Sequence, residues 1–379
     1  MHGTLSLALI ARLALGLLLI SCGQVLESKN PTSEIISEDN SDDDMGDGSE
    51  DATDVDTESW LIPVNEVFGG GPGKDGIPAI SNPKFKPDST ITFLSDDDLV
   101  IGVKFEGQLR TYAHLILDWH EIVNDNLGQR YFALTYCPLT GSAIAWDRNL
   151  GGEVTTFGVS GLLYNSNLIP YDRATGSNWS QMKLLCVQGE NRGQVAGTFR
   201  IVETTWKTWR EMYPGADVMT TDTGYSRSYG FYPYGSYRTS DYLLFPVSQD
   251  DSRLPKKERV IGLMVGDQAK VYRLGAFADS VNAINDVFQG ETVVAAGSRT
   301  DNLMVIYHRQ LPDGTVLTFT PLQGQLPVVM KDNEGTTWDI FGRAVSGPRS
   351  GAELTATRSY IAYWFAWATF FPGAQIYGE

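Results

Sequence analysis

Three closely spaced residues of the chain could form a reactive site. His120 and Glu121 are neighbours, and Cys137 follows His120 by 17 positions, in the stretch YCPLTGSA (136–143). An imidazole and a thiolate are ligands that copper and zinc accept, and a neighbouring carboxylate can orient the ring or act as a base. The pattern therefore predicts a copper or zinc site, or a thiol-dependent site. A shared metal requires His120 and Cys137 to lie within about 8 Å of each other.

Other roles for Cys137 stay open on the sequence alone. A metal needs a third ligand, for which His114 and His308 are available, although no HxH, HExxH or CxxC motif includes them. Cys137 could equally be a buried, inert thiol beside Pro138, because free cysteine packs as a small hydrophobic residue. An oxidising exported compartment would also permit a disulfide between Cys137 and Cys186.

A second set of polar side chains centres on FGVSGLLYNSNLIPYDR (157–173). Its hydrogen-bonding groups gather between glycines and an apolar strand, as in the lining of a ligand pocket. Turn formation could require many of the same residues. The residues expected to line a ligand pocket are Asn124, Asp125, Ser160, Asn165, Ser166, Tyr171 and Arg173.

The stretches that must position these residues recur later in the chain. TTWKTWREMYPGADVM (204–219) matches AYWFAWATFFPGAQIY (362–377), with two tryptophans and the Pro-Gly pair at an offset of 158. VIGVKFEGQLRTY (100–112) matches VIGLMVGDQAKVY (260–272), and three shorter matches keep the same order. Matches in one order at a nearly constant offset predict an internal duplication. The two halves are residues 96–219 and 256–379.

The reactive residues belong to the first half only. A residue that the fold requires tends to persist in both copies, whereas a site residue can survive in one. The tryptophans common to both halves are therefore predicted to be structural, and the second half to be degenerate. In the second half, His120, Glu121 and Cys137 are replaced by Val281, Asn282 and Ser298.

Each half is predicted to contain short strands and one or two helices. VIGVKF and QLRTY alternate as in a β-hairpin, HEIVND suggests a helical turn or two, and TWKTWREMY is a helix that Pro214-Gly215 stops. We therefore predict an α+β fold, rich in β-structure, in which two similar halves pack as one pseudo-symmetric body. A helix from about His120, followed by a strand ending at Cys137, would bring the two residues together beside SGLLYNSN (160–167).

A tyrosine-rich loop, residues 220–255, joins the halves. It carries six tyrosines between Tyr225 and Tyr242, among glycines and serines. Such amphipathic rings can bind sugars, peptides or another protein. The alternative is an ordered loop that packs over the junction of the halves.

The N-terminal residues predict export and a lipid anchor. Residues 1–22 contain an apolar run of eight followed by LISCG, which is typical of a lipoprotein signal peptide cleaved before Cys22. Gly23 is not the aspartate that retains enteric lipoproteins at the inner membrane, so an outer membrane is favoured in a Gram-negative cell. Residues 23–59 form an acidic linker that we expect to be disordered, and an N-terminal extension, residues 60–95, follows.

The charge of the chain argues against nucleic acid as a partner. From residue 60 onward there are 27 Lys and Arg against 33 Asp and Glu, a net charge of −6 without a basic stripe. The expected partners are a membrane, through the lipid anchor, and an envelope polymer or protein.

Several stretches together resemble the bacterial DUF3179 family, whose function is unknown. They are HEIVND (120–125), YCPLTGSA (136–143), FGVSGLLYNSNLIPYDR (157–173), DTGYSRSYGFYPYGSY (222–237), KERVIG (257–262) and WFAWATFFP (364–372). The resemblance implies no particular activity. Many members have YCPLCGSA, and Thr140 of this chain replaces the second cysteine, which removes a two-thiolate clip.

Two functions are compatible with these features. The first is a lipid-anchored extracytoplasmic protein with a polar, metal-binding or thiol-dependent site in its first half. The second is a non-catalytic envelope-binding or scaffold lipoprotein that acts through the tyrosine-rich loop. No motif is complete enough to name a reaction.

Overall fold

A computed structural model describes residues 59–379. Contacts divide the chain after Asp54, and all described residues belong to the second unit, Val55–Glu379. The predicted signal peptide, its Cys22 and the acidic linker up to residue 58 lie outside the described residues. No helix within residues 59–379 has the length and apolar character needed to cross a membrane.

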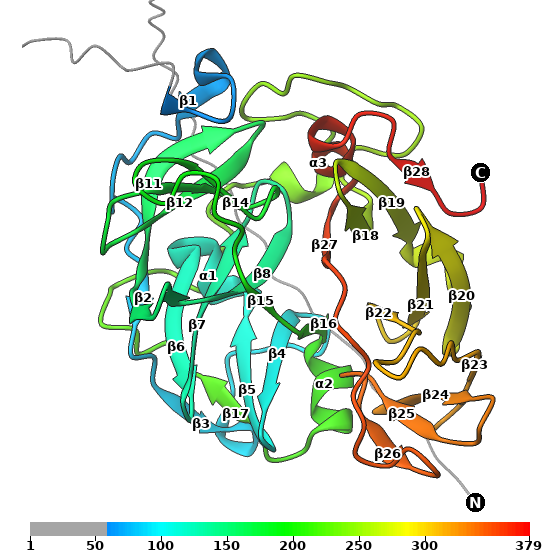
Figure 1. Cartoon of the computed structure of the whole chain (residues 1–379). Helices are drawn as coiled ribbons and strands as arrows, with labels where there is room; N and C mark the ends of the chain where they lie inside the picture. Colours follow the sequence, from blue (N-terminus) through cyan, green and yellow to red (C-terminus); the bar gives the residue numbers. More distant parts are fainter. Residues whose placement is uncertain (1–58) are drawn as a thin grey trace, which may run out of the picture. The chain divides into compact units, whose positions relative to one another are not determined.

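The fold is rich in β-structure, with several sheets and few helices, as predicted (Figure 1). The first half and the N-terminal extension together form three sheets and a two-stranded ribbon. The first sheet has the order β16 (Ile201–Thr205), β4 (Leu99–Phe105), β5 (Gln108–Ala113), β17 (Asp217–Met219), β3 (Phe85–Pro87). The second has the order β15 (Thr198–Phe199), β8 (Ser142–Asp147), β7 (Arg130–Cys137), β6 (Ile122–Leu127), β2 (Ile80–Ser81). The third has the order β1 (Val67–Gly69), β11 (Phe157–Tyr164), β12 (Asn167–Asp172), β13 (Asn178–Ser180), β14 (Leu185–Gln188). The ribbon is β9 (Asn149–Leu150) with β10 (Glu153–Val154).

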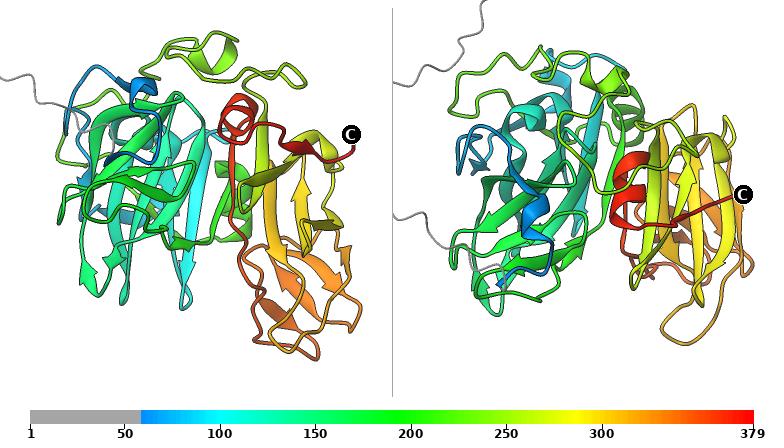
Figure 2. Two further views of the ribbon diagram at one scale, coloured as in Figure 1. Left: turned by 45° about the horizontal axis from the view of Figure 1, so that its top comes forward. Right: turned by 90° about the horizontal axis from the view of Figure 1, so that it is seen from above.

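The second half contains three further sheets, which follow the first half along the chain (Figure 2). In order they are β27 (Ser359–Tyr363), β18 (Arg259–Val265), β19 (Gln268–Arg273), β28 (Gln375–Ile376); β20 (Asn282–Phe288), β21 (Glu291–Ser298), β22 (Leu303–His308); and β23 (Phe319–Pro321), β24 (Val328–Asp332), β25 (Thr337–Asp339), β26 (Ala344–Ser346). Short 3-10 helices are η2 (Val64–Glu66), η3 (Asp88–Thr90), η4 (Tyr237–Thr239) and η5 (Leu274–Ala276).

Two of the three described α-helices occupy matching places. α2 (Trp206–Met212) follows β16, and α3 (Trp364–Phe370) follows β27. Trp209 and Trp367 are fully buried. Each lies so close to a glycine, Gly102 of β4 or Gly262 of β18, that an added Cβ would stand 1.8 or 2.2 Å from the indole. The strands must therefore carry glycine at these positions for the helices to pack.

Other contacts also recur in both halves. The Asn124 side chain exchanges two hydrogen bonds with the backbone of Phe157 (2.7 and 2.8 Å), and Asn285 does the same with Phe319 (both 2.8 Å). The indole N–H of Trp179 donates to Asp172 at 3.0 Å, and Trp338 donates to Asp332 at 2.9 Å. Both indoles are fully buried, as expected of structural residues.

The prediction of a helix in HEIVND is wrong. The third helix, α1 (His114–His120), ends where that stretch begins, and Ile122 already belongs to β6. Glu121 ends the helix because its φ of 57° lies outside the helical region. The β-branched Ile122 and Val123 then favour a strand, which pairs with β7.

The two halves share their interior. Two of the three hydrophobic clusters of the described chain contain residues of both halves. The backbone N–H of Tyr363 in β27 donates to Thr140 O at 2.8 Å, and Arg259 of β18 pairs with the buried Glu203 of β16. Contacts across the junction therefore include backbone, apolar and charged groups.

Candidate functional site

His120 is buried at the end of α1 with both ring nitrogens engaged. Its Nδ1 lies 2.7 Å from Pro78 O and its Nε2 lies 2.7 Å from the Tyr229 hydroxyl. A carbonyl can only accept, so Nδ1 carries the proton and Nε2 accepts from Tyr229. Burial lowers the pKa of His120, which keeps the ring neutral. The imidazole is therefore held by protein groups on both sides.

Glu121 is buried and strained beside it. Its backbone has a positive φ of 57°, rare for a residue with a side chain. Burial raises the pKa of its carboxyl to about 8, Asp118 adds to the rise, and a hydrogen bond from Tyr234 opposes it. The carboxyl is thus mostly protonated at pH 7.

Cys137 is a protonated, buried thiol. It is 1% exposed, and its Sγ lies 3.7 Å from Ser166 O. Burial, with a smaller contribution from the Glu121 carboxylate, raises the pKa of Cys137 to about 11. Cys137 and Cys186 are both free, so they form no disulfide. A thiolate, which a nucleophile or metal ligand requires, is disfavoured here.

The predicted metal site has no set of ligands. Among residues 59–379, no group of three or more His, Cys, Asp and Glu side chains could hold a metal ion. His114 lies 3.1 Å from Glu203 instead, and His308 lies 3.4 Å from Glu291. In the described part of the chain, residues 59–379, no hydrogen bond or ring contact joins His120 to Cys137. The donor set therefore does not fit copper or zinc.

The SGLLYNSN segment forms a tight turn. Asn165 and Ser166 have φ of 50° and 62° and join β11 to β12 as a two-residue hairpin, the arrangement in which both central residues need positive φ. Ser166 Oγ donates to Phe245 O at 2.8 Å, and Asn165 Oδ1 accepts from Ser248 N at 2.7 Å. Ser160 donates to Ile169 O. These side chains close the hairpin and attach the tyrosine-rich loop to it.

The other residues expected to line a pocket also bond to protein groups. Asn124 binds Phe157, as described above. Asp125 accepts from Tyr112 and Arg110. Tyr171 and Arg173 both donate to Asp75 of the N-terminal extension, Arg173 at 2.8 Å. None of the residues expected to line a pocket borders either of the two cavities described below.

The tyrosine-rich loop covers the end of α1. The Tyr237 hydroxyl donates to Leu139 O at 2.9 Å, and Trp119 Nε1 donates to Phe231 O at 3.1 Å. Arg238 pairs with the buried Asp118. Outside these contacts, the Phe231 side chain is 71% exposed and Tyr242 52% exposed. The loop thus seals the Glu121 region and still presents rings to solvent.

A cavity of about 390 Å³ lies where the two halves meet, away from this region. Its walls come from β4, the start of β7 and β15 of the first half and from residues 341–356 of the second. Basic side chains and phenylalanines alternate around it. They are Lys104, Arg130, Arg200 and Arg343, with Phe105, Phe132, Phe199 and Phe341. We call it the basic cavity.

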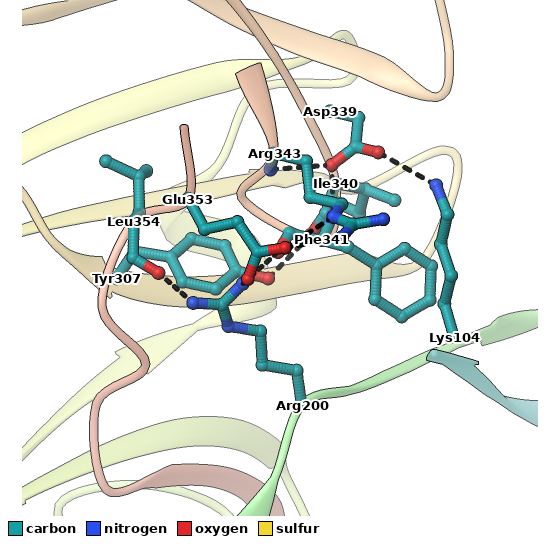
Figure 3. A network of polar contacts seen from close by, with 9 residues as sticks. All are labelled: Lys104, Arg200, Tyr307, Asp339, Ile340, Phe341, Arg343, Glu353 and Leu354. Atoms are coloured by element: carbon teal, nitrogen blue, oxygen red, sulfur yellow. Dashed lines mark hydrogen bonds and ion pairs between the residues drawn. The ribbon is translucent and has the colours of Figure 1, made fainter. Parts of the chain in front are cut away.

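Three of the basic groups share two carboxylates (Figure 3). Glu353 accepts from Arg200 at 3.2 Å and from Arg343 at 2.6 Å, and Asp339 accepts from Lys104 at 3.1 Å. Arg200 also donates to the carbonyls of Phe341 and Leu354. These bonds fix the guanidinium of Arg200 at the cavity wall.

Arg130 is the exception in the basic cavity. Its guanidinium carbon lies 4.9 Å from the centre of the Phe105 ring and 5.0 Å from that of Phe199. Within residues 59–379 the guanidinium makes no hydrogen bond and no ion pair. Arg130 is exposed, so it is a cation oriented by two rings whose five N–H donors face solvent and bond to no group of the described residues.

Comparison with protein-family models identifies the family of the chain. Residues 74–374 match the model of a family described as a protein of unknown function (DUF3179). The chain belongs to the DUF3179 family. No curated protein and no solved structure matches it. The family assignment confirms the resemblance seen in the sequence and adds no activity to it.

The basic cavity of this DUF3179 protein escapes a search for motifs. Arg130 lies in a hairpin, Arg200 follows β15, and Arg343 lies in a turn before β26, so only the fold brings them together. One signal was available in the repeat. Arg130 and Glu291 each begin the matching strands β7 and β21, so the two halves carry opposite charges at this place.

Proposed function

We propose that the protein is a lipid-anchored, extracytoplasmic binding protein that holds a small anionic ligand in the basic cavity. The observation that carries the proposal is the guanidinium of Arg130, which is held between two phenylalanine rings with all its donors free. Guanidinium groups match carboxylate and phosphate in geometry and charge. The cavity volume of about 390 Å³ suits a small ligand.

The balance of charge supports an anion. Three guanidiniums line the basic cavity, and among residues 59–379 the only carboxylate bonded to any of them is Glu353. Glu106 is the one other acid in the lining. An anion entering between Arg130 and Arg200 would therefore meet the charge of Arg130, which pairs with no carboxylate of the described residues, beside the charge of Arg200, which pairs with Glu353.

Membrane attachment rests on the sequence. LISCG before Cys22 supports lipidation, and the acidic linker, residues 23–59, supports a spacer between the membrane and the folded unit. We propose that this unit faces the periplasm or the exterior, at the outer membrane in a Gram-negative cell.

The recurring contacts of Trp209 with Gly102 and of Trp367 with Gly262 support an origin by internal duplication. So do the matched sheet orders around β4–β5 and β18–β19. In this view the basic cavity arose at the junction of the copies, and its free arginine belongs to the first half.

A metal- or thiol-dependent reaction in the first half has less support. The thiol of Cys137 is protonated and buried, and the ring of His120 has no free nitrogen. A second binding function is favoured by the exposed rings of the tyrosine-rich loop, Phe231 and Tyr242, which could bind an envelope polymer or protein.

Titration of residues 55–379 with benzoate tests the anion-binding proposal, because all three hydrophobic clusters of the described chain lie within this unit. We expect saturable binding of benzoate, weakened by salt, and none of benzylammonium, which has the opposite charge. Arg130→Ala should abolish binding. Arg192→Ala, at an exposed position in a loop that does not border the cavity, is the matched control. Equal binding by wild type and Arg130→Ala, or preference for the cation, would contradict the proposal.

A further inference from the structure

A second, smaller cavity adjoins the basic cavity. Its volume is about 60 Å³, and it shares Thr198, Phe199, Arg200 and Ala356 with the larger one. Beyond these shared residues its walls are mainly aliphatic, from β8, β18, β22 and β27. Ile144, Ile261, Val305 and Ile361 are at most 6% exposed. We call it the apolar cavity.

We infer that the ligand of the basic cavity is an anion with a short, unbranched apolar tail, whose head binds Arg130 and Arg200 and whose tail enters the apolar cavity. This inference rests on the proposed function and names the class of ligand: short-chain carboxylates. Arg200 lines both cavities, so a head group that contacts Arg200 stands at the entrance to the smaller one.

The size of the apolar cavity limits the tail. One water needs about 10–15 Å³ on the scale used for this volume. A cavity of about 60 Å³ thus has room for roughly four to six waters, which corresponds to a tail of only a few methylenes. This small volume favours a single unbranched chain over a ring.

Most polar groups in the wall of the apolar cavity are satisfied within the protein. Glu203 binds His114 and Arg259, and Thr357 donates to Ile306 O at 2.9 Å. Arg358 is exposed and without an ion pair in the described chain, so it lies where the cavity meets solvent. The interior itself therefore offers a tail dispersion contacts and no partner for a second charge.

A series of carboxylates of increasing length tests the inference on residues 55–379. We expect affinity to rise about fourfold per methylene from acetate to hexanoate, the gain for burying one methylene, and to level off for decanoate. Adipate, which has the length of hexanoate and a second carboxylate, should bind more weakly than hexanoate.

Ala356→Phe is the matching variant, because Ala356 is exposed and borders both cavities. In this variant the increase in affinity from acetate to hexanoate should be lost. The carboxylate series measured on the wild-type protein tests the inference by itself, even if the Ala356→Phe protein does not fold. Equal affinities for acetate and hexanoate, or tighter binding of adipate, would overturn the inference while the proposed anion site stands. Absence of binding by every carboxylate would overturn both.

Discussion

Replacing Glu121 by Gln should stabilise the protein at neutral and alkaline pH. Burial raises the pKa of this carboxyl from 4.5 to about 8 in the folded state. Between these values the folded carboxyl is protonated and the unfolded one is ionised, so the folded state binds more protons. Stability therefore falls as pH rises through this window. Gln has nearly the same shape, can still accept from Tyr234, and never ionises.

The size of the effect follows from the shift. One pKa unit corresponds to about 1.4 kcal/mol. Relative to pH below 4.5, the raised pKa of Glu121 lowers the free energy of unfolding by about 3 kcal/mol at pH 7, and by about 5 kcal/mol well above pH 8, where the buried carboxyl is ionised. Below pH 4.5, where the carboxyl is protonated in both states, wild type and Glu121→Gln should be nearly equal in stability.

Urea unfolding of residues 55–379 at pH 4, 7 and 9 measures these differences. Glu203→Gln is the control, because Glu203 is also buried and has the opposite shift. Burial would raise the pKa of Glu203, but Arg259 and His114 lower it overall. Its ionised form therefore stabilises the fold, and Glu203→Gln should destabilise it by about 3 kcal/mol at pH 7. Our account of Glu121 is refuted if Glu121→Gln is less stable than wild type at pH 7, or if its stability varies with pH as the wild type's does.

Three further outcomes are expected. Trp209→Ala and Trp367→Ala should each lower the free energy of unfolding by about 3–5 kcal/mol, and a harmless substitution at either would contradict their role in packing. Cys137 and Cys186 should resist iodoacetamide in the folded unit at pH 7.5 and react fully in urea, because both are buried and burial raises the pKa of each to about 11; rapid labelling of native Cys137 would show a reactive thiol. In the full chain, Cys22→Ala should leave the precursor uncleaved or release the protein from membranes, and unchanged mass and partitioning would remove the lipid anchor from the proposal.

The sequence matches between residues 204–219 and 362–377 predicted helix positions well, because the matching tryptophans are packing residues. Trp206 and Trp364 both begin a seven-residue helix, and the second tryptophan of each covers a glycine of the first hairpin. Local patterns were less reliable where the backbone changes direction. HEIVND has the composition of a helical turn, but Glu121 takes a positive φ and the following residues pair as a strand.

The candidate site could be predicted only in part. The sequence pointed to His120, Glu121 and Cys137, and the structure shows all three buried, the first two at the end of α1 and Cys137 at the end of β7. Their spacing could not reveal that Pro78 and Tyr229 form hydrogen bonds with both ring nitrogens of His120, since these partners lie 42 and 109 positions away in the sequence. The basic cavity was hidden for the same reason, because its arginines come from separate strands and turns.

The turn after Cys137 has a consequence for how the sequence of this protein can vary. Thr140 O accepts the backbone N–H of Tyr363 in β27, and the Tyr363 ring lies so near Gly141 that an added Cβ would stand 2.9 Å from it. The stretch that most resembles a reactive motif is thus where one half docks against the other. Selection on CPLTG would then preserve the fit between the halves even in a relative that binds nothing. A separately produced first half would expose this surface, so the halves are unsuited to exchange between family members unless β27 is exchanged with the turn.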